Sequence, residues 1–282
     1  MLTFTTITAI RAFLAKVSDN RQQKTIGFVP TMGALHEGHL ELMRRAKQEN
    51  DLLVVSIFVN PIQFNNKEDL EKYPRMPETD SALLSSVGCD VLFAPGVSEM
   101  YPEPDKQLYD FGLLAGVMEG KSRPGHFNGV AIVVRKLFEI IEPHKAYFGE
   151  KDFQQLAIIQ QLVKMLKMPV DIIPCRIVRE ADGLAMSSRN MRLSIEERAV
   201  APSIYDTLKK AVDIAAQHTP ASLKQWVMEE FTKQPLFSPE YVEIAEDRLL
   251  QPVISWNSSV GTMMFVAVFL GKVRLIDNIR IF

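Results

Sequence analysis

Two histidines, His36 and His39, are three residues apart in a glycine-containing segment that follows a β-rich run. Gly33 and Gly38 allow the backbone to approach a ligand closely, and the N–H groups that open a following helix favour phosphate. Imidazoles add neutral or cationic donors to such a site. The segment Met32–His39 therefore indicates contact with a phosphate-bearing ligand.

Two other interpretations of the histidine pair stay open. A metal site is one, although no Cys or further His is nearby and the zincin pattern His-Glu-x-x-His is absent. The other is a structural role in a helix-capping turn. Neither the G-x-G-x-x-G nor the G-x-x-x-x-G-K-[ST] pattern occurs, which disfavours dinucleotide and P-loop binding.

Further donors come from two more segments. Ser187, Ser188 and Arg189 place two hydroxyls and a guanidinium in sequence, a set that suits phosphate oxygens. The alternative is a polar interdomain loop whose serines cap the next helix. Lys151 lies at a strand-to-helix junction and offers a point charge to a polyphosphate, with Asp152 as a plausible N-cap. The alternative for Lys151 is a solvated side chain in a turn.

Neutral amides and further cations also lie after a predicted strand or before a predicted helix. Asn60 and Gln63 come after the second predicted strand, and their amides suit a small polar substrate. Arg123–His126 again places cations before a helix. Ligands of open parallel sheets bind outside the carboxyl ends of the strands, so we expect these segments to meet at one edge of one sheet.

The elements that must position these residues follow from periodicity. Short β-rich runs alternate with helical patterns up to about residue 175, which predicts βαβ units and a doubly wound, Rossmann-like parallel sheet over residues 1–175. The predicted strands are 25–29, 51–59, 91–94, 146–148 and 170–174, and the predicted helices are 39–50, 78–87, 128–141 and 152–168. Residues 176–282 predict a smaller α+β domain: a long helix from a Ser194/Glu197 capping box toward His218, a helix over 222–233, and strands 241–245, 262–270 and 273–276.

Composition limits the function further. The chain has 282 residues, with 32 Lys+Arg against 34 Asp+Glu, and this balance argues against nucleic acid as the main partner. Apolar runs of about eight residues are too short to span a membrane, which needs about 20. Two cysteines, Cys89 and Cys175, are too few for a disulfide framework and favour a reduced core role. We therefore expect a cytoplasmic, soluble protein.

Taken together, these segments resemble a known family. Met32–His39 is similar to the His-x-Gly-His signature of the nucleotidylyl-transferase superfamily, and Met186–Asn190 resembles that group's mobile second motif. With Asn60–Phe64, Arg123–His126 and Gly149–Gln155 in this order, the chain resembles the pantoate–β-alanine ligases from about residue 24 to Asn278. The resemblance implies ATP-dependent condensation of (R)-pantoate with β-alanine through a pantoyl adenylate, releasing AMP and pyrophosphate.

The resemblance also implies roles for individual residues. His36 and His39 match the family's catalytic pair, with His39 as proton donor, and Lys151 and Arg189 match catalytic triphosphate contacts. Gln63 and Gln155 match residues that hold pantoate, with Gln63 also near β-alanine, and Asn60 is grouped with them. The implied ATP contacts are Met32, Gly33, Ala34, Leu35, His36, Glu37, Gly38, His39, Gly149, Glu150, Lys151, Asp152, Val178, Met186, Ser187, Ser188 and Arg189.

Cofactor, domain motion and assembly are implied in the same way. Mg²⁺ is expected with ATP, mainly on phosphate oxygens, and Asp80 aligns with an acidic region linked to Mg²⁺. Because an adenylate must be kept from water, the second domain is expected to act as a lid. Family members are usually homodimers.

Two rival functions remain. One is a nucleotidyltransferase that stops at adenylyl transfer to a phosphorylated precursor; it would need extra cations where Asn60, Gln63 and Gln155 are neutral. The other is a noncatalytic nucleotide sensor, against which the intact set of donors counts.

Overall fold

The computed structural model describes residues 1–19, 24–65, 67–256 and 261–282. These residues form two compact units. The first unit comprises Met1–Phe111, Arg123–Glu150 and Gln155–Arg176. The second unit comprises Gly112–Ser122, Lys151–Gln154 and Ile177–Phe282. The second unit therefore includes two short segments that lie far upstream of its main part in the chain.

The first unit is built on a parallel sheet. Within the described residues it has six strands in the order β1-β4-β3-β2-β5-β6. The strands are β1 (Leu2–Phe4), β2 (Ile26–Thr31), β3 (Leu52–Ile57), β4 (Val91–Phe93), β5 (Lys145–Gly149) and β6 (Asp171–Cys175). The chain proceeds outward from β2 to β3 and β4, then returns to place β5 on the other side of β2. The strand order therefore reverses between β2 and β5, which is where open α/β sheets bind ligands.

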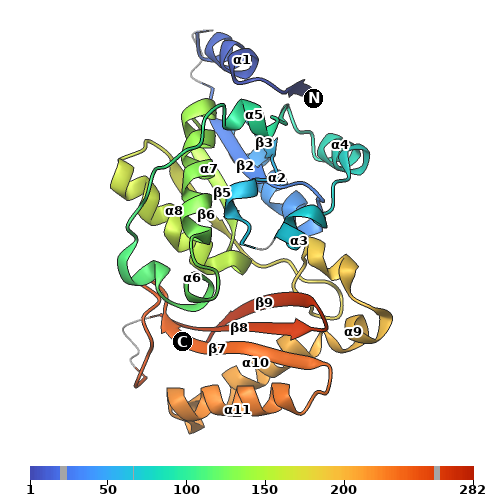
Figure 1. Cartoon of the computed structure of the whole chain (residues 1–282), viewed down its shortest axis with the longest axis vertical. Coiled ribbons are helices and arrows are strands. Elements are labelled where there is room, and N and C mark those ends of the chain that lie inside the picture. The colour runs from blue at the N-terminus through green and yellow to red at the C-terminus, as the bar shows by residue number, and fades with distance from the viewer. Residues whose placement is uncertain (20–23, 66, 257–260) are drawn as a thin grey trace. The chain divides into compact units, whose positions relative to one another are not determined.

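Both faces of this sheet are buried, because side chains alternate along each strand. Phe28 and Val54 face one apolar cluster, while Val29 and Val55 face another. The first cluster includes residues of α1 (Ile7–Asp19), α7 (His126–Ile141) and α8 (Phe153–Leu166), and the second includes residues of α2 (Glu37–Glu49) and α4 (Pro77–Ser86). In Figure 1, α7 lies in front of the strands. This arrangement confirms the predicted doubly wound fold.

The second unit has an antiparallel sheet, β7 (Phe237–Glu246), β8 (Thr262–Leu270) and β9 (Val273–Arg280), in that order. Helices α10 (Ser203–Ile214) and α11 (Pro220–Thr232) pack against it through one apolar cluster, along one side of the strands (Figure 1). The predicted α+β class is confirmed. The functional assignment of the two predicted domains, including the lid, stays a prediction.

One helix prediction was wrong. The Ser194/Glu197 capping box is present, but the helix that it opens, α9 (Ile195–Val200), is short. Pro202 follows, and a proline cannot donate the backbone hydrogen bond that would continue the helix. A separate helix, α10, then begins at Ser203 and is followed by the 3₁₀ helix η5 (Ala215–Gln217). The predicted single helix toward His218 is therefore three consecutive elements.

The remaining elements are short. They are the helices α3 (Lys67–Glu71), α5 (Val97–Met100) and α6 (Met118–Ser122), and the 3₁₀ helices η1 (Pro61–Gln63), η2 (Gly112–Ala115), η3 (Glu150–Asp152) and η4 (Ser188–Arg192). Among the residues described, none of the helices combines the length and apolar character needed to cross a membrane.

Candidate active site

The turn between β2 and α2 contains the predicted histidine pair and has an unusual backbone. Gly33 and Ala34 both have positive φ angles, 81° and 49°. Glycine adopts this region without cost, whereas alanine must be held there by its surroundings. The Thr31 hydroxyl accepts the Gly33 N–H at 3.2 Å and donates to the Ser56 carbonyl at 2.8 Å, which anchors the turn to β3.

Asp80 of α4 supplies the constraint on Ala34. Its carboxylate accepts the N–H of Ala34 at 3.0 Å and that of Leu35 at 2.8 Å, one on each oxygen. Only 2% of Asp80 is exposed. Its two oxygens hold the turn that precedes the histidines, and the expected place of Asp80 near Mg²⁺ stays a prediction.

His36 and His39 lie at the start of α2, His36 as the N-cap and His39 three residues into the helix. Their ring centroids lie 4.0 Å apart, with the ring planes tilted by 36°. The His36 N–H donates to His39 Nδ1 at 3.3 Å. An Nδ1 that accepts leaves the proton of a neutral imidazole on Nε2, so His39 presents an Nε2–H donor. The helix N-terminus and this donor together favour an anion.

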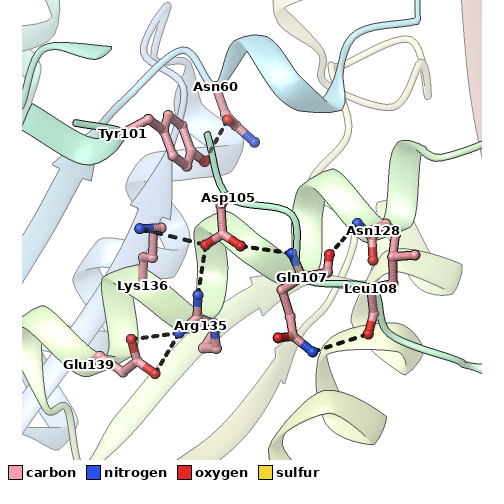
Figure 2. A network of polar contacts seen from close by, with 9 residues as sticks. All are labelled: Asn60, Tyr101, Asp105, Gln107, Leu108, Asn128, Arg135, Lys136 and Glu139. Atoms are coloured by element: carbon pink, nitrogen blue, oxygen red, sulfur yellow. Dashed lines mark hydrogen bonds and ion pairs between the residues drawn. The ribbon is translucent and has the colours of Figure 1, made fainter. Parts of the chain in front are cut away.

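The predicted amide pair lies after β3, at η1. Asn60 Nδ2 donates to Gln63 Oε1 and to the Gly129 carbonyl, each at 3.1 Å. Asn60 Oδ1 accepts the Tyr101 hydroxyl at 2.9 Å, as Figure 2 shows. Only 1% of Asn60 is exposed, so these bonds fix its orientation.

Gln63 connects this amide pair to the histidine turn. Its Nε2 lies 3.1 Å from the sulfur of Met32, which directly follows β2. Its backbone carbonyl accepts from His126 Nδ1 at 2.8 Å, so that nitrogen has the proton. The structure thus brings two separately predicted segments together at the carboxyl ends of β2 and β3.

An ion cluster lies beside Tyr101 in the first unit (Figure 2). Asp105 contacts Arg135 at 2.9 Å and Lys136 at 3.6 Å, and Lys136 Nζ lies 5.4 Å from the centre of the Tyr101 ring. Burial alone would raise the pKa of Asp105, but the Gln107 N–H and the two cations lower it below its usual value. Burial raises the pKa of Tyr101, so its hydroxyl stays protonated as a donor at neutral pH.

The predicted cations Lys151 and Arg189 belong to the second unit. The Lys151 carbonyl accepts from Asn278 Nδ2 of β9 at 3.1 Å. The neighbouring Asp277 binds Arg179 through both oxygens, at 2.7 and 2.9 Å. Asn278, the residue at which the resemblance ends, therefore holds the Lys151 backbone.

Arg179 in turn organises the segment before the predicted serines. It donates to the Gly183 carbonyl at 3.1 Å and lies 3.5 Å over the Tyr205 ring. Val178 accepts the Met186 N–H at 3.0 Å, which closes residues 178–186 into a turn. That turn leads directly into Ser187, the N-cap of η4.

Ser187 does have the capping role that was one of its two interpretations. Its Oγ accepts the Arg189 N–H at 3.2 Å. Ser188 is buried, and Asn190 donates to the Glu180 carboxylate and the Ala185 carbonyl. Because a serine hydroxyl can accept and donate together, capping does not remove its capacity to bind phosphate.

The remaining predicted residues lie close to Lys151 in the chain. Gly149 ends β5, Glu150 and Asp152 lie in η3, and Gln155 is in α8. The neighbouring Gln154 is buried and bonds Glu119, Leu114 and Val117 of residues 112–122 at 2.8 to 3.0 Å. The sequence did not single out Gln154, Tyr101 or Gly129, although Tyr101 follows the carboxyl end of β4, a position that signals a site.

The predicted residues therefore form two groups. Met32–His39, Asn60, Gln63, Gly149, Glu150 and Gln155 belong to the first unit, and Lys151, Asp152, Val178, Met186, Ser187, Ser188 and Arg189 belong to the second. Across the described parts of the chain, no three His, Cys, Asp or Glu side chains are grouped to hold a metal ion.

This geometry defines a doubly wound α/β protein with polar turns at the point where its strand order reverses. The pantoate–β-alanine ligase family model matches residues 2–280. Pantothenate synthetase of Porphyromonas gingivalis is 52% identical over 277 residues, covering 98% of each chain.

Solved structures agree with this match. Pantothenate synthetase of Thermus thermophilus has a TM-score of 0.92 and 43% identity, with both chains fully covered. A pantoate–β-alanine ligase of Francisella tularensis, complexed with beta-gamma ATP and β-alanine, has a TM-score of 0.81 and 37% identity over 99% of this chain and 97% of that one. The chain belongs to the pantoate–β-alanine ligase family.

Proposed function

We propose that this protein condenses (R)-pantoate with β-alanine, using ATP and releasing AMP and pyrophosphate. The family match supports this function, as does the ligase structure complexed with beta-gamma ATP and β-alanine. The structural observation that carries the proposal is the contact between Gln63 and Met32. It joins a pair of neutral amides, suited to a hydroxy acid, to a helix N-terminus suited to phosphate.

The reaction has two steps. A carboxylate oxygen of pantoate attacks the α-phosphorus of ATP, and the bond from that phosphorus to the bridging oxygen breaks, releasing pyrophosphate. The amine of β-alanine then attacks the acyl carbon of pantoyl adenylate, loses a proton, and displaces AMP. Negative charge grows on phosphoryl oxygens in the first step, so preplaced donors lower its barrier.

We assign the catalytic donors to His36, His39, Lys151 and Arg189. Because His39 Nδ1 accepts the His36 N–H, the donor that His39 offers is its Nε2–H. Asn60, Gln63 and Gln155 are assigned to pantoate and β-alanine. The remaining ATP contacts are assigned to Met32, Gly33, Ala34, Leu35, Glu37, Gly38, Gly149, Glu150, Asp152, Val178, Met186, Ser187 and Ser188.

Mg²⁺ accompanies ATP in this proposal and is held by phosphate oxygens, as Mg²⁺ commonly is. The described residues offer no protein cage for it, and Asp80 already accepts two backbone N–H groups. We also infer a cytoplasmic homodimer, in which the second unit acts as a lid that protects the adenylate from water; analytical ultracentrifugation tests the dimer.

The test measures AMP and pyrophosphate release with ATP and pantoate, with and without β-alanine. The proposal predicts pantoate-dependent pyrophosphate release and β-alanine-dependent AMP release. A nucleotidyltransferase would show no β-alanine-dependent AMP, and a nucleotide sensor would bind ATP without turnover. His39→Ala should slow adenylation about 100-fold or more, the cost of losing such a donor. His218→Ala, at the end of η5, is the matched control and should leave the rate unchanged.

A further inference from the structure

The hydroxyl of Tyr101 is connected to Gln63 through one buried side chain. Tyr101 donates to Asn60 Oδ1 at 2.9 Å, and Asn60 Nδ2 donates to Gln63 Oε1 at 3.1 Å. All three residues belong to the first unit. Figure 2 shows the Tyr101 ring pointing its hydroxyl at the Asn60 amide.

Chemistry alone fixes which way the Asn60 amide faces. Its second contact is the Gly129 carbonyl at 3.1 Å, and a carbonyl oxygen can only accept. Nδ2 must therefore face Gly129, which leaves Oδ1 facing Tyr101. Oδ1 needs a donor there because Asn60 is 1% exposed, and the tyrosine hydroxyl is that donor.

The orientation of the Asn60 amide also determines that of the Gln63 amide. Since Asn60 Nδ2 is a donor, the Gln63 atom that faces it must be Oε1. The Gln63 NH₂ group is turned the other way, toward Met32 of the β2–α2 turn. A thioether sulfur is a weak acceptor, so a carboxylate or hydroxyl oxygen of a substrate would bind this NH₂ group more strongly.

Tyr101 itself is held in place from several sides. Its backbone N–H ends α5 by donating to the Val97 carbonyl at 2.8 Å. Its ring contacts Phe58, with centroids 6.0 Å apart, and Lys136 lies over the ring. The hydroxyl is thus fixed before any substrate arrives.

We propose that Tyr101 is a positioning residue, which acts through Asn60 to present the Gln63 NH₂ group to an oxygen acceptor of the hydroxy-acid substrate. The identity of that substrate rests on the proposed function. Without the hydroxyl, Asn60 Oδ1 is left unpaired, so the Asn60 side chain loses one of the bonds that hold it and fixes the Gln63 amide less firmly.

Tyr101→Phe tests this directly because it removes one oxygen atom. We expect the KM for pantoate to rise about tenfold, because a less firmly held Gln63 amide must be ordered when the substrate binds, while the KM for ATP stays within about twofold. Tyr147→Phe is the matched control: its hydroxyl also bonds an asparagine, Asn50, at 2.7 Å, but within the described residues no contact links it to Gln63. It should lose stability and keep both KM values.

A double-mutant cycle with Gln63→Ala shows whether Tyr101 acts through Gln63. In the Gln63→Ala background, Tyr101→Phe should no longer change the KM for pantoate. A tenfold rise that persists there, or a wild-type KM in Tyr101→Phe, would overturn the inference.

A second measurement separates this inference from the proposed function. The side-chain NH₂ signals of Gln63 can be assigned by NMR with Gln63→Ala and followed in the substrate-free protein. Tyr101→Phe should shift them and Tyr147→Phe should not; unshifted signals in Tyr101→Phe would exclude the positioning role whatever the substrate. Failure of the wild type to make pantothenate would instead remove the proposed function.

Discussion

The carboxylate of Asp80 accepts the N–H of Leu35 at 2.8 Å, although 45 residues separate the two in the chain. The other oxygen of Asp80 accepts from Ala34, whose φ is positive. One buried side chain thus sets the backbone from which α2 and its two histidines begin. This dependence can be tested separately from any metal role.

Asp80→Asn should reduce stability by about 1–3 kcal/mol, because one backbone N–H then faces an NH₂ group instead of an oxygen. The rate of adenylation should fall as the turn relaxes, and added Mg²⁺ should not restore it. Urea unfolding and initial rates at several Mg²⁺ concentrations check both. Asp171→Asn, on the exposed start of β6, is the control. Recovery at high Mg²⁺ would favour direct metal binding by Asp80.

Gly129→Ala should displace the amide pair. A Cβ on Gly129 would lie 2.5 Å from the Ile62 carbonyl oxygen and 2.8 Å from the Gln63 Cα, so the η1 backbone must shift. We expect a loss of about 1–3 kcal/mol of stability and a higher KM for pantoate. Gly96→Ala, where the added Cβ meets nothing within 4 Å, should resemble the wild type. Equal behaviour of the two variants would contradict this account of η1.

Asn278→Ala should weaken the use of ATP through Lys151. The variant removes the amide that holds the Lys151 carbonyl, at a cost of about 1 kcal/mol in stability. The KM for ATP should rise while that for pantoate is unchanged. Gln225→Ala, an exposed amide on α11 that bonds Glu229, is the control. An increase in the KM for pantoate alone would be inconsistent with the assignment of Lys151.

The two thiols should be unreactive in the folded protein. Burial raises the pKa of Cys89 from 9.0 to about 12 and also raises that of Cys175, so few thiolates exist at pH 8. Alkylation should be slow in buffer and modify both residues in urea. The folded-state pKa of Cys89 exceeds its unfolded value, so its contribution to stability is complete below pH 9 and is lost as pH rises toward 12. Rapid native labelling at pH 8 would contradict this burial.

The sequence predicted the parts of the fold that depend on local pattern. The apolar run at Leu52–Ile57 and the Ser194/Glu197 capping box are both present. The edge strand β1 was missed because its three residues are too short to show a period. The break at Pro202 was missed because the apolar spacing continues across it.

The candidate site was predictable where residue types cluster in sequence, as in Met32–His39. The contacts of Tyr101 with Asn60 and of Asp80 with Leu35 were not predictable, because 41 and 45 residues separate these partners in the chain. Such contacts arise only when strands place distant turns at one edge. A hydroxyl or a carboxylate that bonds an amide far away in the chain forms no motif of fixed spacing, so no sequence pattern indicates the contact.

The second unit is formed by three separate parts of the chain, and this affects how the protein can be cut into fragments. Arg274 of β9 pairs with Glu119 at 2.7 Å, and Tyr241 of β7 donates to the same carboxylate at 2.8 Å. Both partners of Glu119 lie more than a hundred residues downstream of it. A fragment that starts at residue 176 would lack residues 112–122 and 151–154 and leave this half-buried guanidinium without one of its acceptors. During synthesis, residues 112–122 therefore leave the ribosome well before the strands of the C-terminal sheet that pair with Glu119.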